Sequence, residues 1–209
     1  MKIVMATGNP GKVKEFRELL KGLPLEILSL KDFENIEEVA ETGTTFLENS
    51  CQKVTGYAEQ TGLACVADDS GLCVDALDGA PGIYSARFAQ SDREKCQKLL
   101  DLMKDKENRK ARFMCCATLW LPCEWVEKIK NNQSLDFDII NDHVISCKGS
   151  LEGEIAWEMK GERGFGFDPV FYVPGYHKHL AELSPEIKNQ ISHRGQAMRK
   201  IKKILEMIK

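Results

Sequence analysis

Residues 2–21 constrain the fold most, because they read as a strand, a glycine turn and a helix in direct succession. Residues 2–6 are mostly apolar and strand-like, and the apolar side chains of residues 13–21 fall on one helical face. The turn between them is Thr7-Gly8-Asn9-Pro10-Gly11-Lys12. A buried strand that passes through a short turn into a helix is typical of an α/β fold.

The same turn is a candidate anion site. A turn that opens a helix presents unpaired backbone N–H groups, the helix dipole adds partial positive charge, and Lys12 supplies a full charge. It is not a Walker A loop, because only two residues separate Gly8 from Gly11 and Val13 replaces the Ser or Thr. The turn therefore suits polyphosphate with metal ligands from elsewhere, and the alternative is an ordinary turn with an exposed lysine.

Composition limits the class of protein. A chain of 209 residues, 43% hydrophobic and 29% charged, can bury a sizeable core and suits one large domain over residues 1–209 or two closely packed lobes. The net charge of −3 argues against a nucleic-acid binder. Strand-like sequence from Lys2 leaves no room for a signal peptide, and no apolar run is long enough for a membrane span, so we expect a cytoplasmic protein without membrane contact. Eight cysteines, mostly in apolar segments and without a CxxC motif, indicate buried free thiols in a reducing compartment.

Helices and strands alternate early in the chain, and antiparallel strands dominate its middle, which predicts an α/β fold with a mixed sheet. Capping boxes beginning at Thr45 and Ser91 predict helix starts, and Gly62 predicts a helix end. A last helix is expected over 192–208. Strands are expected over 2–6, 25–29, 63–67, 72–76, 111–121, 137–148 and 170–173. The pair 111–121 and 137–148 reads as a long hairpin joined through 131–134.

Two adjacent carboxylates, Asp68 and Asp69, follow the strand expected over 63–67 and precede Ser70 and Gly71. The carboxyl end of a strand is where α/β proteins hold ligands, and adjacent strand residues point to opposite sides. Mg²⁺ takes one or two carboxylates together with phosphate oxygens and water. A polar turn rich in Asp, Ser and Gly is the alternative.

Polar side chains on the helix after Thr45 are further candidates. The spacing of Glu48 from Thr45 explains it as a helix cap. Asn49 and Lys53 lie four positions apart and therefore present an amide and an ammonium on the same side. A solvated helix face is the alternative for this pair.

The segment Gly164-Phe165-Gly166-Phe167-Asp168-Pro169 interleaves aromatic residues with glycines. It can let a planar ring approach the backbone, with Phe as a stacking surface and Asp as an acceptor. A tight loop with Phe side chains in the core is the alternative.

Lys188, His193 and Arg194 lie around the start of the last helix. Positive charge there opposes the helix dipole, which suggests a functional role.

In their order along the chain, these segments resemble the inosine triphosphate pyrophosphatase family, the non-canonical purine nucleoside triphosphate pyrophosphatases. The matching segments are 6–12, 41–43, 45–49, Lys53, 68–72, 79–87, 164–169 and 192–195. Each motif is short, but the ordered set covers nearly the whole chain. The resemblance implies an elongated two-lobed α/β fold with a central mixed β-sheet flanked by helices, an active-site cleft between the lobes, and a homodimer.

The resemblance also implies Mg²⁺-dependent hydrolysis of ITP, dITP and XTP to the monophosphate and pyrophosphate, which would cleanse the nucleotide pool. By position, the triphosphate would be bound by Thr7, Gly8, Asn9, Pro10, Gly11, Lys12 and Lys53. Glu41 and Asp69 would ligate the metal, and Asp69 would be the catalytic base. Ser70 would contact substrate, and the nucleoside pocket would consist of Phe165, Gly166, Phe167, Asp168, Lys188, His193 and Arg194.

Several alternatives stay open at this level. The chain could be a pyrophosphatase for another modified nucleotide, or a catalytically silent nucleotide-binding sensor. Either Asp68 or Asp69 could serve as the base, because a metal-bound carboxylate is a weak base. The chain departs from the family pattern in lacking a Pro-Arg pair in 156–161, in having His179 where threonine is common, and in a longer hairpin around Asn131.

Overall fold

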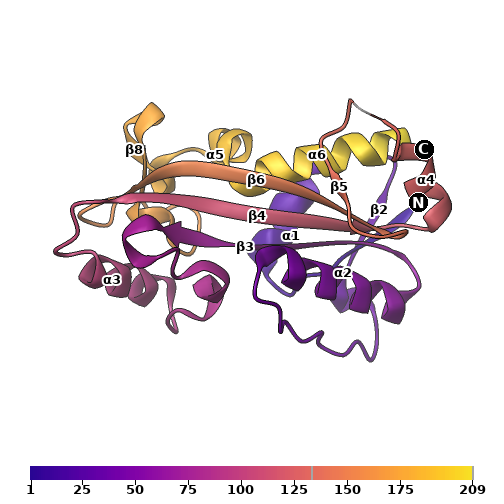
Figure 1. Ribbon diagram of the computed structural model, residues 1–209, viewed down its shortest axis with the longest axis horizontal. Coiled ribbons are helices and arrows are strands. Elements are labelled where there is room, and N and C mark those ends of the chain that lie inside the picture. Colours follow the sequence, from indigo (N-terminus) through magenta and orange to yellow (C-terminus); the bar gives the residue numbers. More distant parts are fainter. Residues whose placement is uncertain (133, 209) are drawn as a thin grey trace. The chain divides into compact units, whose positions relative to one another are not determined.

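The computed structural model describes residues 1–132 and 134–208 (Figure 1). The chain divides into two compact units. Unit 1 comprises Met1–Asp69, Cys115–Gly149 and Arg194–Lys209, and unit 2 comprises Ser70–Met114 and Ser150–His193. Gln133, in the predicted hairpin connection, lies outside the described residues. The single domain over 1–209 and the active-site cleft between lobes stay predictions.

The predicted mixed sheet is confirmed. Within the described residues, one eight-stranded sheet has the strand order β2 (Glu26–Ser29), β1 (Lys2–Met5), β3 (Ala64–Val74), β4 (Lys110–Trp120), β6 (Val144–Ile155), β7 (Phe171–Val173) and β8 (Lys178–His179). The short strand β5 (Asp138–Ile139) pairs with β6 off this path. Strand β1 runs parallel to β2 and β3, whereas β6 and β7 pair antiparallel, as do β7 and β8.

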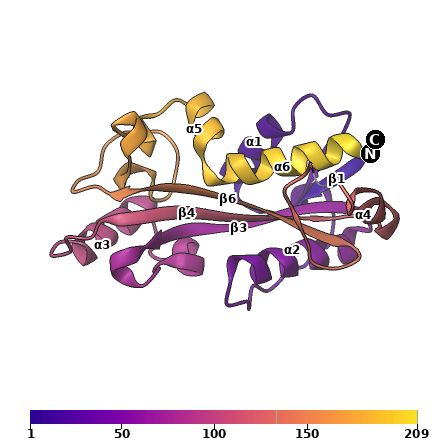
Figure 2. The same cartoon turned by 45° about the horizontal axis from the view of Figure 1, so that its top comes forward.

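Helices cover both faces of the strands in unit 1 (Figure 2). They are α1 (Pro10–Leu19), α2 (Phe46–Thr61), α4 (Cys123–Ile129) and α6 (His193–Met207), which begins at the last residue of unit 2. Ile3 and Met5 share a core with side chains of α1, α4 and α6, whereas Val4 and Ala6 share one with side chains of α2. This alternation follows from the two-residue period of a strand, and it fixes α1 and α2 on opposite sides of β1.

Unit 2 has its own hydrophobic core. Its helices are α3 (Asp92–Leu102) and α5 (Pro185–Ile191). Leu99 of α3, Phe113 of β4 and Phe171 of β7 are buried in this core.

Short 3-10 turns in both units complete the described elements: η1 (Leu30–Asp32), η2 (Asp75–Leu77), η3 (Gly82–Arg87), η4 (Asp168–Val170), η5 (Pro174–Tyr176) and η6 (Leu180–Glu182).

The helix boundaries that depend on local caps are confirmed. Thr45 and Ser91 cap α2 and α3, and in each helix the glutamate three residues later bonds back to the cap backbone. Gly62 ends α2 in the left-handed conformation, with φ of 67°.

Three expectations were wrong. The expected strands 63–67 and 72–76 form one strand, β3, so Asp68 and Asp69 lie within a strand and not in a turn after it. The expected strand 137–148 is divided into β5 and β6, and α4 precedes it. Lys188 lies on the separate short helix α5, not at the start of α6.

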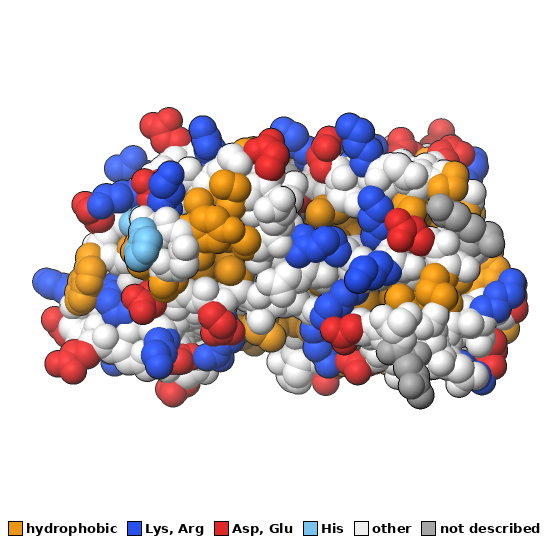
Figure 3. All heavy atoms as spheres, turned by 90° about the horizontal axis from the view of Figure 1, so that it is seen from above, with side chains coloured by type: hydrophobic (Ala, Val, Ile, Leu, Met, Phe, Trp, Pro, Cys, Tyr) orange, Lys and Arg blue, Asp and Glu red, His pale blue; other side chains and the backbone are white. Residues whose placement is uncertain are grey.

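The thiols, the helices and the surface give three further findings. All eight cysteines, each within the described part of the chain, are free thiols, as predicted, but the expectation that they are buried was wrong for Cys123, which is exposed, and for Cys51 and Cys73, which are half-buried. No helix over 1–132 or 134–208 has the length and hydrophobicity needed to cross a lipid bilayer. On the face seen in Figure 3, acidic and basic side chains are interspersed.

Replacing Gly62 tests the helix end. Gly62→Ala should lower the free energy of unfolding by about 1 kcal/mol, because a residue with a Cβ atom is strained at φ of 67° while the space around it is open. Urea denaturation measures the change. Gly175→Ala is the matched control, since Gly175 is exposed, has open space around it and does not have this positive φ. Equal midpoints for the two variants would contradict the assignment.

Candidate active site

The turn before α1 is stabilised by its own side chains. Asn9 is the N-cap of α1, and its Oδ1 accepts hydrogen bonds from Gly11 N at 2.9 Å and from Lys12 N at 3.2 Å. Asn9 N in turn donates to Thr7 Oγ1 at 3.2 Å. The expectation of unpaired N–H groups was therefore wrong for Gly11 and Lys12. A phosphate that binds these two groups must displace the Asn9 carboxamide.

Asp68 lies at the centre of a buried ion-pair network in unit 1. Its Oδ1 is 2.9 Å from Lys12 Nζ, and its Oδ2 accepts from Arg194 Nε at 3.2 Å. Arg194 Nη1 also donates to Glu15 Oε2 at 2.6 Å. These two carboxylates explain how a cation can occupy the first turn of α6, where the helix dipole opposes it. Glu15 was not predicted, although it lies three positions after Lys12 on the same helix.

The charge state of Asp68 follows from this network. Burial raises the pKa of its carboxyl, but Lys12 and Arg194 outweigh burial and hold that pKa well below its usual range. The side chain of Asp68 is 0% exposed. A carboxylate that binds protons so weakly and has no access to water is a poor general base.

Asp69 faces the other side of β3, toward α2. Asn49 Nδ2 donates to its Oδ2 at 3.2 Å, and Lys53 Nζ lies 3.5 Å from its Oδ1. Lys53 Nζ also donates to Glu41 Oε2 at 3.1 Å. Asn49 and Lys53 thus share a helix face, as predicted, and that face meets a carboxylate instead of solvent. The structure brings together Glu41, Lys53 and Asp69.

The two acidic groups are electrostatically linked to both lysines. Lys53 lowers the pKa of Asp68 as well as that of Asp69, and Lys12 lowers the pKa of Asp69 as well as that of Asp68. Burial nevertheless raises the pKa of Asp69 above its ordinary value, because the cations only partly offset it. Asp69 is therefore a stronger base than Asp68.

The pair Glu41 and Asp69 suits Mg²⁺ in its donor chemistry. Both supply carboxylate oxygens, both lie next to the same ammonium, and Glu41 remains about one-third exposed. Across residues 1–132 and 134–208 there is no group of three or more His, Cys, Asp or Glu side chains placed to hold a metal ion. Two carboxylates match a Mg²⁺ site that is completed by phosphate oxygens and water.

A second cluster lies in unit 2, in the glycine-aromatic segment. Asp168 Oδ2 accepts from Lys188 Nζ at 2.6 Å and from Phe165 N at 2.9 Å. Lys188 Nζ also lies 4.7 Å from the centre of the Phe165 ring. Gly164 has φ of 82°, and a Cβ there would lie 2.0 Å from Asp168 Oδ2. Asp168 therefore organises the loop and holds Lys188 against the Phe165 ring.

The remaining predicted residues of unit 2 occupy different environments. Phe167 is buried in the core and packs on Phe88, with ring centroids 5.7 Å apart. His193 stacks on Phe113 at 4.8 Å with nearly parallel rings. Ser70 is half-buried on β3. Of the two phenylalanines in the loop, Phe165 is the one that retains an exposed surface.

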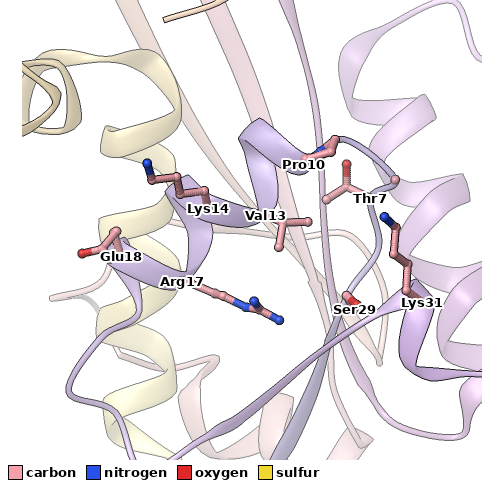
Figure 4. A pocket seen from close by; sticks show the side chains of 9 residues that line it. Thr7, Pro10, Val13, Lys14, Arg17, Glu18, Ser29 and Lys31 are labelled. Atoms are coloured by element: carbon pink, nitrogen blue, oxygen red, sulfur yellow. The ribbon is translucent and has the colours of Figure 1, made fainter.

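A pocket of about 350 Å³ within unit 1 is lined in part by the turn before α1 (Figure 4). Its lining residues are Thr7, Gly8, Pro10, Val13, Lys14, Arg17, Glu18, Ser29 and Lys31. Figure 4 shows Arg17 extending from α1 toward the strand that carries Ser29. Lys14, Arg17 and Lys31 were not predicted from the sequence, since exposed cations on a helix or after a strand are common.

Known families, proteins and solved structures resemble this chain along nearly its whole length. The family model described as "Ham1 family" matches residues 3–204. The chain is 45% identical over 204 residues to a dITP/XTP pyrophosphatase of Exiguobacterium, covering 96% of this chain and 95% of the relative. It is 45% identical to a dITP/XTP pyrophosphatase of Desulforamulus reducens, covering 100% and 97%. The solved structure of a HAM1 protein from Coxiella burnetii superposes with a TM-score of 0.83 at 38% identity, covering 99% and 98%.

Proposed function

Because this chain belongs to the Ham1 family, we propose that it hydrolyses dITP, XTP and ITP to the nucleoside monophosphate and pyrophosphate. The observation that carries the proposal is the cluster in which Lys53 lies between Glu41 and Asp69, with Asn49 bonded to Asp69. Relatives named dITP/XTP pyrophosphatase match 96% and 100% of the chain at 45% identity. The activity would remove non-canonical purine nucleotides from the pool.

We assign the charge-bearing residues of unit 1 to the triphosphate. Glu41 and Asp69 would hold Mg²⁺, which when bound supplies the positive charge that offsets phosphate oxygens. Lys53 pairs with both carboxylates in the structure, so its ammonium would lie next to the metal ligands and would form ion pairs with phosphate oxygens there. Lys12 and the turn from Thr7 to Gly11 would bind the remaining phosphate oxygens.

Asp69 is the residue we assign as general base. Its side chain is 11% exposed, whereas that of Asp68 is 0% exposed and pairs with Lys12 and Arg194. The Asn49 amide fixes the orientation of the Asp69 carboxylate by bonding to Oδ2. Asp69 would accept the proton of the attacking water, and Asp68 would hold Lys12 and Arg194 in place.

The residues of unit 2 support a preference for 6-oxopurines. Hypoxanthine and xanthine present an acceptor at position 6, where adenine presents an amino donor. The Lys188 ammonium next to the Phe165 ring is a donor beside a stacking surface. An adenine facing such a donor leaves buried hydrogen-bonding groups unmatched, which can discriminate by up to ~10⁴-fold. Guanine keeps the 6-oxo group, so its 2-amino group must be the one excluded.

A substrate panel tests the proposal. We expect the purified protein to release pyrophosphate from dITP and XTP in the presence of Mg²⁺ and to lose this activity when EDTA removes the metal. ATP and GTP should be poor substrates for the reasons given above. Equal turnover of ITP and ATP would contradict the assignment of Lys188 and Phe165 to the pocket for the purine base. Turnover of a modified pyrimidine triphosphate in place of dITP would favour a different nucleotide substrate, and absence of all turnover would favour a silent sensor.

The homodimer and the cytoplasmic location rest on the resemblance alone and remain predictions. Light scattering coupled to size-exclusion chromatography measures the first, and a mass near twice the 23.6 kDa of one chain is expected. A mass equal to one chain at micromolar concentration would exclude a stable dimer.

A further inference from the structure

Helix α3 holds one residue of the glycine-aromatic loop, Gly166, through two side chains. Asp92 Oδ2 accepts a hydrogen bond from Gly166 N at 2.8 Å, and Cys96 Sγ donates to Gly166 O at 3.3 Å. Asp92 and Cys96 are four positions apart, so they lie on the same face of the helix. Gly166 is thereby bonded at both its donor and its acceptor.

The protonation and burial of the two side chains suit these roles. Cys96 is 1% exposed, and burial raises the pKa of its thiol to about 12, so it keeps the proton that it donates. Asp92 is about half exposed and also pairs with Lys95 at 3.2 Å. Gly166 has φ of 64°, in the left-handed region, and these two bonds fix its backbone there.

Gly166 lies directly between the two aromatic residues of the loop, Phe165 and Phe167. On one side, Phe167 is anchored in the core against Phe88. On the other side, Phe165 has its N–H on Asp168 and its ring beside Lys188. The direction in which the Phe165 ring points is therefore set from α3 through Gly166 and from α5 through Lys188.

We propose that Asp92 and Cys96 are positioning residues that orient the Phe165 ring for stacking on the purine base of the substrate. The inference rests on the proposed function, since it gives that reaction a determinant of base selectivity outside the predicted site residues. Neither side chain needs to contact substrate for this role. Loss of either bond should loosen the ring and weaken base binding, while the residues of unit 1 that act on the phosphates are unchanged.

The test compares Asp92→Ala and Cys96→Ala with two controls. Ser91→Ala removes the N-cap of α3 without touching Gly166, and Lys95→Met removes the ion pair of Asp92 while leaving its bond to Gly166. For Asp92→Ala and Cys96→Ala we expect KM for dITP to rise about threefold to tenfold with kcat changed less than twofold, and the preference for dITP over dGTP to fall. Ser91→Ala and Lys95→Met should leave KM within about twofold of the wild-type value.

Two further measurements separate positioning from damage to the helix. Hydrogen exchange of the Gly166 N–H should become faster in Asp92→Ala but not in Lys95→Met. Cys96→Ser, which keeps a donor, should retain most of the wild-type KM. If Ser91→Ala raises KM as much as Asp92→Ala does, or if Gly166 exchange is unchanged in Asp92→Ala, the inference is overturned. If wild-type protein releases no pyrophosphate from dITP, the proposed function fails, and the exchange measurement alone decides whether α3 holds the loop.

Discussion

Asp69→Asn is expected to lower kcat for dITP hydrolysis by at least about 100-fold. The substitution keeps the size of the side chain and its place opposite Asn49 and Lys53, but it removes the group that we assign to accept the proton from water. Steady-state pyrophosphate release at saturating dITP measures the change. A kcat within a few-fold of the wild-type value would reject Asp69 as the base.

Metal dependence separates the two roles proposed for Asp69. Glu41→Gln removes a predicted metal ligand and the charge that pairs with Lys53 but leaves the proposed base, so raising Mg²⁺ should recover most of its activity. The low kcat of Asp69→Asn should persist at saturating Mg²⁺, because added metal does not replace a base. Asp138→Asn is the matched control, since Asp138 pairs with Lys148 on the exposed surface of unit 1. Recovery of Asp69→Asn by Mg²⁺ alone would limit Asp69 to metal binding.

Asp68→Asn is expected to lower the free energy of unfolding by about 3 kcal/mol. Removing one member of a buried ion pair costs about 3–5 kcal/mol, and the lower end applies because Arg194 keeps its bond to Glu15. Urea denaturation of the variant and the wild-type protein measures the difference. Asp138→Asn again serves as the control, since an exposed pair of this kind contributes no more than about 1 kcal/mol. Equal losses in the two variants would show that the Asp68 network is not stabilising.

The same comparison has a defined pH dependence. The pKa of Asp68 is lower in the folded protein than the value of about 3.9 in an unfolded chain, so the unfolded state binds more protons below that pH. The stability that Asp68 contributes is therefore fully present above about pH 4 and is lost as the pH falls toward the folded pKa. The difference between wild-type protein and Asp68→Asn should be constant from pH 5 to pH 7 and should narrow below pH 4. A difference that grows on acidification would contradict the assignment.

Features that depend on nearby residues could be predicted from the sequence. The starts of α2 and α3 follow from capping boxes whose partners are three residues apart, and the end of α2 follows from Gly62. The shared face of Asn49 and Lys53 follows from helix geometry alone. These signals involve neighbours within one turn, so the rest of the fold does not alter them.

Features that depend on distant partners could not be predicted in the same way. Two adjacent aspartates read as a turn, yet β3 continues through them because each carboxylate meets a cation. The partners of Asp68 are Lys12 and Arg194, which lie 56 and 126 positions away in the sequence. Helix α4 has only seven residues, too few for a periodic pattern to be distinguished from a loop. The bonds from α3 to Gly166 also join residues about 70 positions apart.

The Asn9 carboxamide at the start of α1 has a consequence for which anions the turn can retain. Any incoming oxygen gains only the difference between its own bonds to Gly11 and Lys12 and those that the amide already makes. A charged acceptor exceeds a neutral one by roughly 1 kcal/mol for each bond, so a single free phosphate has little advantage over the resident side chain. The turn therefore retains those anions that make several contacts at once. The length and charge of the anion, and not this turn alone, decide whether it stays bound.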